Sequence, residues 1–135
     1  MAYVLGTRSK DNLKGVHPDL VKVVERAITL TTQDFTVIEG VRTTKRQQEL
    51  YAQGRTKPGS KVTNADGVKN KSNHQAKADG YGHAVDIVPY PVDWNTTSKF
   101  RDIADAMKQA AKDLGVKLEW GGDWKFTDMP HFEVK

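Results

Sequence analysis

A stretch of 28 residues, from Arg55 to Gly82, shows no helical or strand period and lies in the middle of a chain of only 135 residues. It consists mainly of Gly, Lys, Ser, Asn and Asp. Inside a compact domain, a structureless segment of this length is either functional or disordered. The whole chain is long enough for one domain and too short for two with cores of their own.

Periodic elements lie on both sides of that segment. Spacing of apolar residues, capping patterns and helix-stopping glycines predict three helices, which begin at His17-Pro18, at Thr44 and at Thr97 or Ser98, the last two ending at Gly54 and Gly115. β-Branched and aromatic residues predict strands at 35–41, 84–88, 117–120 and 131–134. We expect a single α+β domain over residues 1–135, with 1–16 as a polar lead-in, a small antiparallel sheet and about three helices.

The composition excludes several kinds of site. With no cysteine, the chain has no disulfides, thiolate metal sites, iron–sulfur clusters or thiol nucleophiles. No apolar run approaches the roughly 20 residues of a membrane span, so stable membrane insertion is not expected. The N-terminus lacks the pattern of a secretory signal, so we expect a cytosolic protein that needs another route to any work outside.

Positive charge is concentrated in one region. The net charge is +4, yet nine Lys and Arg face only two acidic residues between Arg42 and Lys77, which gives that stretch +7 and the remainder −3. Either an anionic partner or a simple solvated, lysine-rich loop explains such a stretch. The aromatic residues lie mostly outside it and no nucleic-acid-binding motif is present, so a nucleic-acid partner is not expected.

Asp86 lies between Val85 and Ile87 in an apolar strand, where an ionised carboxylate is costly unless it is paired or bound to a metal. Because side chains alternate along a strand, His83 and Asp86 point to opposite faces and cannot hold the same ion. His74, at the front of a glycine-containing loop, can reach Asp86 instead. The alternative is a buried aspartate with a backbone partner and a histidine at the surface.

The C-terminal strand supplies the remaining candidates. His131 and Glu133 share one face of it, and Asp128 lies three residues before His131, where a turn through Pro130 could bring it back beside the ion. Two imidazoles and one carboxylate match a catalytic zinc site, which keeps an open position for water. Asp128 would then take a proton from that water.

Three motifs occur in the order Ser72-x-His74, Gly82-His83-Ala84-Val85-Asp86 and Asp128-x-x-His131, after Gly40-Val41-Arg42-Thr43 with Gln47, Leu50 and Gly54. Together, from about Val16 onward, they resemble the zinc D,D-carboxypeptidase and L-alanyl-D-glutamate endopeptidase family of peptidoglycan peptidases, which is related in fold to the hedgehog signalling domain. Two features depart from the family pattern: the five extra residues Lys77–Tyr81, and an aspartate where many carboxypeptidase relatives have glutamate.

The resemblance implies that His74, Asp86 and His131 hold one zinc ion and that Asp128 is the general base. His83 would lie behind the metal ligands or face the solvent.

The same resemblance implies substrate contacts. Arg42 would bind a substrate carboxylate or stabilise the tetrahedral oxyanion, with a strand-end salt bridge as the alternative. Ser72 would hydrogen-bond the substrate. Trp124 would line the cleft or serve only in packing.

The expected activity is hydrolysis of the L-alanyl-D-glutamate bond in peptidoglycan stem peptides, by a protein most similar to a monomeric, single-domain endolysin of a tailed phage with no separate wall-binding domain. Such an endolysin would wait in the host bacterial cytoplasm and act on the periplasmic cell wall after the membrane is permeabilised. The alternatives are a D-alanyl-D-alanine carboxypeptidase and a non-catalytic basic module that binds wall polymer or nucleic acid.

Overall fold

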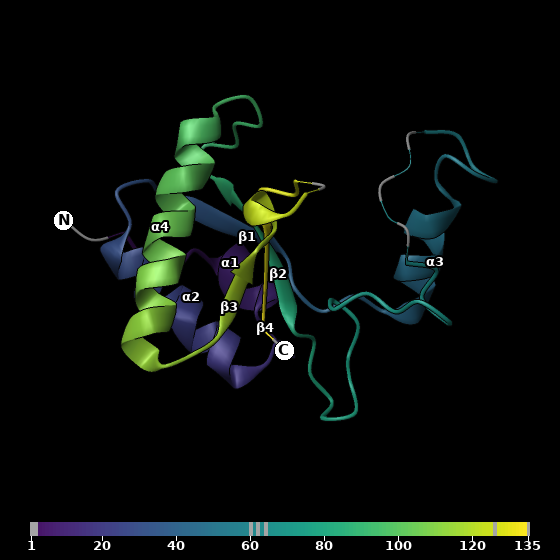
Figure 1. The fold of residues 1–135 in the computed structure, drawn as a ribbon, viewed down its shortest axis with the longest axis horizontal. Coiled ribbons are helices and arrows are strands. Elements are labelled where there is room, and N and C mark those ends of the chain that lie inside the picture. Colours follow the sequence, from purple (N-terminus) through teal and green to yellow (C-terminus); the bar gives the residue numbers. More distant parts are fainter. Residues whose placement is uncertain (1–2, 60, 62, 64, 126, 135) are drawn as a thin grey trace.

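The computed structural model describes residues 3–59, 61, 63, 65–125 and 127–134. The elements are α1 (Thr7–Asn12), α2 (Pro18–Leu30), β1 (Phe35–Glu39), α3 (Thr44–Ala52), β2 (Ala84–Pro89), α4 (Thr97–Leu114), β3 (Leu118–Trp120), a 3-10 turn (Gly121–Asp123) and β4 (His131–Val134). The predicted α+β class is confirmed, with one more helix than expected (Figure 1).

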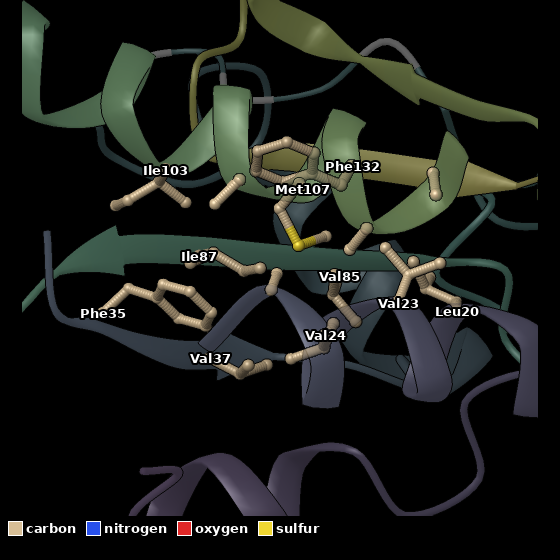
Figure 2. Close-up of a cluster of buried hydrophobic side chains, with 14 of the residues drawn as sticks. Leu20, Val23, Val24, Phe35, Val37, Val85, Ile87, Ile103, Met107 and Phe132 are labelled. Carbon is tan, nitrogen blue, oxygen red and sulfur yellow. The ribbon is translucent and has the colours of Figure 1, made fainter. Parts of the chain in front are cut away.

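The four strands form one antiparallel sheet in the order β1-β2-β4-β3. Helices α2 and α4 pack against each other and against one face of this sheet. Figure 2 shows Val85 and Ile87 of β2 between Val24 of α2 and Met107 of α4. We call the sheet with α1, α2 and α4 the body of the molecule.

Both long helices have the ends that the sequence predicts. Pro18 is the first residue of α2, where its missing N–H is no loss, and the His17 side chain accepts a hydrogen bond from the Asp19 backbone N–H. Gly115 ends α4 in the left-handed conformation, with φ of 68°, which an L side chain rarely adopts.

The other face of the sheet carries polar side chains. Asp86 is the register partner of Glu39 in β1 and of His131 in β4, so the three lie side by side across three strands. An irregularity between Val37 and Glu39 shifts the register of β1 at this point. The strand ends at Glu39, two residues before the predicted end at Val41.

Helix α1 lies within the stretch interpreted from sequence as a polar lead-in. It has no apolar stripe and no side-chain cap, so periodicity does not reveal it. Tertiary hydrogen bonds hold it instead: the Val37 backbone N–H donates to Ser9 Oγ at 3.0 Å, and Asn12 Nδ2 donates to the Val37 carbonyl at 2.8 Å. These bonds satisfy backbone groups at the outer edge of β1.

Helix α3 and the residues after it lie to one side of the body, away from α2 and α4 (Figure 1). We call the described part of residues 43–75 the α3 lobe. Thr43, rather than the predicted Thr44, caps α3 by accepting the Arg46 backbone N–H at 3.1 Å. Among the described residues, no helix combines the length and apolar character that a membrane crossing requires.

Candidate metal centre

His74, Asp86 and His131 converge at the junction of the α3 lobe and the sheet. Asp86 Oδ1 lies 3.3 Å from His74 Nε2 and 3.4 Å from His131 Nδ1. One possible ligand atom from each residue lies within 4.8 Å of the other two. The three residues predicted as metal ligands are therefore neighbours in the fold.

Each of the three has a defined anchor. Asp86 and His131 are cross-strand partners on β2 and β4. His74 comes from the lobe, and its carbonyl oxygen accepts the Arg42 backbone N–H at 2.7 Å, which ties the chain after β1 to the loop before β2. Because the anchors lie on separate segments, only the folded chain assembles the group.

Outer contacts determine which ring nitrogens face the centre. His74 Nδ1 lies 2.9 Å from the Gly40 carbonyl oxygen, and His131 Nε2 lies 2.7 Å from Glu133 Oε1. Both oxygens can only accept, so in the neutral form of each ring the proton sits on the outward nitrogen and the inward nitrogen is available as a ligand. The Glu133 carboxylate is held in turn by Asn73 Nδ2 at 2.7 Å.

Asp86 Oδ1 is buried and has no hydrogen-bond partner among the described residues. A buried carboxylate oxygen without a partner is costly, and a cation between it and the two imidazoles would satisfy it. Two imidazole nitrogens and one carboxylate oxygen are ligands typical of zinc in an open catalytic site. The residues present thus fit such an ion.

Charges in the centre are strongly coupled. Burial raises the pKa of Asp86, but the two histidines beside it, His131 and His74, outweigh burial, so the pKa falls well below its usual range. Burial lowers the pKa of His131, whereas Asp86 and Glu133 raise it to a net value of about 9. Without a metal, His131 therefore holds a proton at neutral pH, which a bound metal ion would have to displace.

Asp128 lies beside the centre in the turn before β4. Its backbone N–H donates to the Gly121 carbonyl at 2.8 Å, and its carbonyl accepts the His131 N–H at 3.2 Å. A Cβ at position 121 would collide with the Asp128 carbonyl oxygen, so this close approach needs glycine. Burial, and then the charge of Asp86, raise the pKa of the Asp128 carboxyl.

The candidate metal centre opens into a cleft of about 470 Å³ between the body and the α3 lobe. Its walls are formed by Glu39, Arg42, Leu50, Thr63, Ser72, His74, Asp86, Trp94, Asp128 and His131. The three candidate ligands and Asp128 thus share one cavity that is open to solvent.

The Arg42 side chain is mostly covered in this wall, at 10% exposure, and already paired. It donates from Nε and Nη2 to the Glu39 carboxylate at 2.8 and 2.9 Å, and from Nη1 to Gln47 Oε1 at 2.8 Å. The salt bridge considered from sequence is therefore present. These bonds use three of the five N–H groups of the guanidinium, which still borders the cleft.

The remaining predicted residues have different places. Ser72 borders the cleft, and its Oγ accepts the His74 backbone N–H at 3.2 Å, which leaves its hydroxyl proton able to donate. The Trp124 ring lies 5.0 Å from the His131 ring. His83 points away from the centre, to Asp79, as the alternation along β2 predicts.

A family model described as phage L-alanyl-D-glutamate peptidase matches residues 1–135. The chain belongs to this family.

Similar proteins carry consistent names. The L-alanyl-D-glutamate peptidase of Escherichia phage T5 is 34% identical over 138 aligned residues, which cover 100% of this chain and 91% of that protein. The peptidoglycan L-alanyl-D-glutamate endopeptidase CwlK of Bacillus subtilis is 38% identical over 114 residues, or 75% of this chain and 60% of CwlK. The crystal structure of the Serratia marcescens L-Ala D-Glu endopeptidase ChiX superposes with a TM-score of 0.76 at 36% identity, covering 96% of this chain and 87% of that one.

The phage peptidase family is the endopeptidase branch of the predicted resemblance, which is thereby confirmed. Sequence reasoning missed Glu39 and Trp94 as cleft residues. The place of Glu39 beside Asp86 depends on the register shift in β1, which the sequence does not reveal. Trp94 lies in an exposed loop, and no periodicity or motif in the sequence points to it. The contact between His131 and Glu133 could have been predicted, because the two side chains lie on the same face of their strand.

Proposed function

We propose that this chain is a zinc-dependent peptidase that hydrolyses the L-alanyl-D-glutamate bond of peptidoglycan stem peptides. The observation that carries the proposal is the convergence of His74 Nε2, Asp86 Oδ1 and His131 Nδ1 around an unsatisfied buried carboxylate oxygen, at a cleft that also contains Asp128. Family membership and the names of the similar proteins support the choice of bond.

In this proposal His74, Asp86 and His131 are the zinc ligands. A bound zinc ion supplies Lewis-acid chemistry, which polarises the scissile carbonyl and lowers the pKa of an attacking water. The Gly40 carbonyl and Glu133 orient the two imidazoles for this task.

Asp128 is the general base, and later the acid that protonates the leaving amine. A base must lie within reach of the water and have a pKa closer to neutrality than an ordinary carboxyl. Its place on the cleft wall and the upward shift of its pKa support this role.

Arg42 and Ser72 position the substrate. The Glu39 carboxylate and Gln47 hold the guanidinium of Arg42 in a fixed orientation, so its two remaining N–H groups can bind a substrate carboxylate or the oxyanion without further ordering. The Ser72 hydroxyl donates to the substrate peptide. The half-exposed Trp124 ring covers His131 and borders the bound peptide.

A cell-wall substrate also explains the positive charge between Arg42 and Lys77. Seven of the nine cations between Arg42 and Lys77 are exposed, at positions 45, 46, 57, 61, 69, 71 and 77. Stem peptides carry several carboxylates, so these cations attract the wall electrostatically. We propose that the protein acts as a phage endolysin, released from the host cytoplasm to the periplasmic wall once the membrane is permeabilised.

Digestion of purified peptidoglycan, followed by mass spectrometry of the products, tests the proposal. The expected products have new L-alanine carboxyl ends, and a chelator abolishes their formation. Release of D-alanine instead would identify a carboxypeptidase, and an unchanged wall would favour a binding module. Either result overturns the proposed bond.

A pair of variants tests the base. Asp128→Asn keeps the size of the side chain but cannot accept the proton, and general-base removal typically costs about 10²–10⁴-fold in rate. Asp123→Asn changes an exposed aspartate of the same loop, which pairs with Lys108, and should leave the rate unchanged. Equal rates in the two variants would rule out Asp128 as the base.

A further inference from the structure

A second group of metal-ligand side chains, His17, Asp79 and His83, lies outside the cleft. Asp79 Oδ2 is 2.7 Å from His83 Nε2 and 4.0 Å from His17 Nε2, and one ligand atom from each residue lies within 4.8 Å of the others. The two imidazole rings meet edge to face at 4.9 Å. The proposed catalytic site uses none of these residues.

Backbone hydrogen bonds fix the positions of the two histidines. The His17 N–H donates to the Gly82 carbonyl at 2.9 Å, and the Gly82 N–H donates to the Gly15 carbonyl at 3.0 Å. The His83 N–H donates to the Asn73 carbonyl at 2.8 Å. This pairing places one histidine at the start of α2 and the other at the start of β2, on a rigid base that needs little ordering to bind a ligand.

Asp79 comes from the segment Lys77–Tyr81, which lies between His74 and the start of β2. The segment closes on itself, because the Lys77 N–H donates to the Tyr81 carbonyl at 2.9 Å. Asp79 Oδ1 accepts the Tyr81 N–H at 2.9 Å, so Oδ2 is the oxygen that faces the histidines. That backbone bond also lowers the pKa of Asp79, which favours the ionised form.

We propose that His17 Nε2, Asp79 Oδ2 and His83 Nε2 form a second binding site for a divalent transition metal such as zinc, which fastens the 77–81 segment to the start of α2. Two imidazoles and a carboxylate suit zinc rather than calcium or magnesium, which prefer all-oxygen ligands. The exposed side of Asp79 gives the ion a path from solvent, and water completes the coordination.

Proton positions change at both histidines. In neutral His83 the metal takes the place of the proton between Nε2 and Asp79, and the ring proton moves to Nδ1. His17 Nδ1 now accepts the Asp19 backbone N–H at 3.1 Å, so its ring proton is on Nε2. Binding through Nε2 moves that proton to Nδ1, where the Asp19 carboxylate, 4.0 Å away, becomes its acceptor.

The second site is the weaker of the two. His74 and His131 each have an acceptor for the outward ring proton, whereas His83 Nδ1 is buried with no partner in the described parts of the chain. A missing outer contact typically costs about 10–100-fold in metal affinity. His17 also exchanges its helix cap for a different bond when the metal binds. A zinc titration should therefore resolve two steps.

The experiment is a calorimetric titration of the metal-free, full-length protein with zinc chloride, with native mass spectrometry to count ions. The expected result is two zinc ions per chain, the second bound about 10–100-fold more weakly. Asp79→Asn keeps the turn, because its amide oxygen still accepts the Tyr81 N–H, and should lose only the weak step. His17→Asn keeps a helix-capping side chain and should do the same.

Two further variants separate this site from the catalytic one. His131→Gln should lose the tight step and keep the weak one. Asp66→Asn alters an aspartate of similar turn geometry, whose Oδ1 accepts three backbone N–H groups in the α3 lobe, and should keep both. A single zinc ion per wild-type chain, or a weak step that survives in Asp79→Asn, would overturn the second site while leaving the proposed function standing.

Discussion

The body and the α3 lobe are held together by different forces. In the body, fully buried apolar side chains such as Leu20, Ile87 and Met107 pack between the sheet and two helices (Figure 2). In the lobe, the side chains that are most buried include Gln47 and Gln75, both at 3% exposure or less. One half of the cleft thus rests on an apolar core and the other on hydrogen bonds.

Two glutamines, Gln47 and Gln75, connect the segments of the lobe by side-chain hydrogen bonds. Gln47 joins α3 to the following loop by donating to the Ala65 carbonyl at 2.8 Å, and it accepts from Arg42. Gln75 donates to the Gly67 carbonyl at 3.1 Å and accepts the Ser72 N–H at 2.9 Å. Hydrogen bonds contribute less net stability than apolar burial, so we expect the lobe to open at a lower free energy than the body.

The largest expected effect comes from the body. Leu20→Ala removes a fully buried side chain of α2, far from the cleft, and should reduce the free energy of unfolding by about 2–5 kcal/mol. Urea denaturation measures this loss of unfolding free energy, and Lys22→Ala, at an exposed position of the same helix, is the control. A loss no greater than that of the control would contradict the packing described for the body.

The next effect arises where the two regions meet. In metal-free protein, His131 has a pKa raised to about 9 from an ordinary 6.5. The stability from this shift is fully present below pH 6.5 and disappears as the pH rises through 9, up to about 3 kcal/mol by linkage. Denaturation between pH 6 and 10, with a chelator, should show this loss in wild type and not in His131→Gln. Parallel pH profiles would refute it.

A smaller and more local effect is expected in the lobe. Gln47→Ala leaves the Ala65 carbonyl and Arg42 Nη1 without the partner they have in the wild type, and should cost about 1–3 kcal/mol. Hydrogen exchange should show faster exchange of amides around 65–67, with α2 and α4 still protected. Gln48→Ala, at the exposed neighbouring position, is the control. Uniform loss of protection throughout the chain would mean that the lobe and the body unfold as one unit.

The smallest effect concerns the surface of the lobe. Replacing Lys57, Lys61, Lys69 and Lys71 together by Gln should slow lysis of cell walls by about tenfold at low salt, while hydrolysis of a small soluble peptide is unchanged. The difference should fade at high salt because the charges are screened. Four exposed lysines elsewhere, Lys10, Lys14, Lys22 and Lys117, provide the matched control. Equal losses on both substrates would remove the electrostatic explanation.

The same contrast explains what could be predicted from the sequence. The sequence predicts helices α2 and α4 because apolar burial produces a periodic stripe of apolar residues, and it predicts the strands because their side chains alternate. The hydrogen bonds that hold the lobe produce no such periodicity, because a single glutamine that bonds to a distant carbonyl does not create a repeating pattern in the sequence. Helix α1 is not predicted for the same reason, since it is attached to β1 by hydrogen bonds of the single residues Ser9 and Asn12.

The candidate site was predicted in part. Alternation on β2 correctly separated Asp86 from His83, and the three proposed ligands meet in the fold. The pairing of Arg42 with Glu39 depends on the register shift in β1 and could not be derived from spacing. The contact of Asp79 with His17 depends on the backbone pairing of 15–17 with 82, which joins residues far apart in the chain.

The most direct test of the proposed centre is an anomalous difference map, recorded at the zinc edge from crystals of the protein grown with zinc. The expected result is a peak about 2.0–2.2 Å from His74 Nε2, Asp86 Oδ1 and His131 Nδ1, facing Asp128. A zinc-loaded crystal with no peak between these three atoms would contradict it.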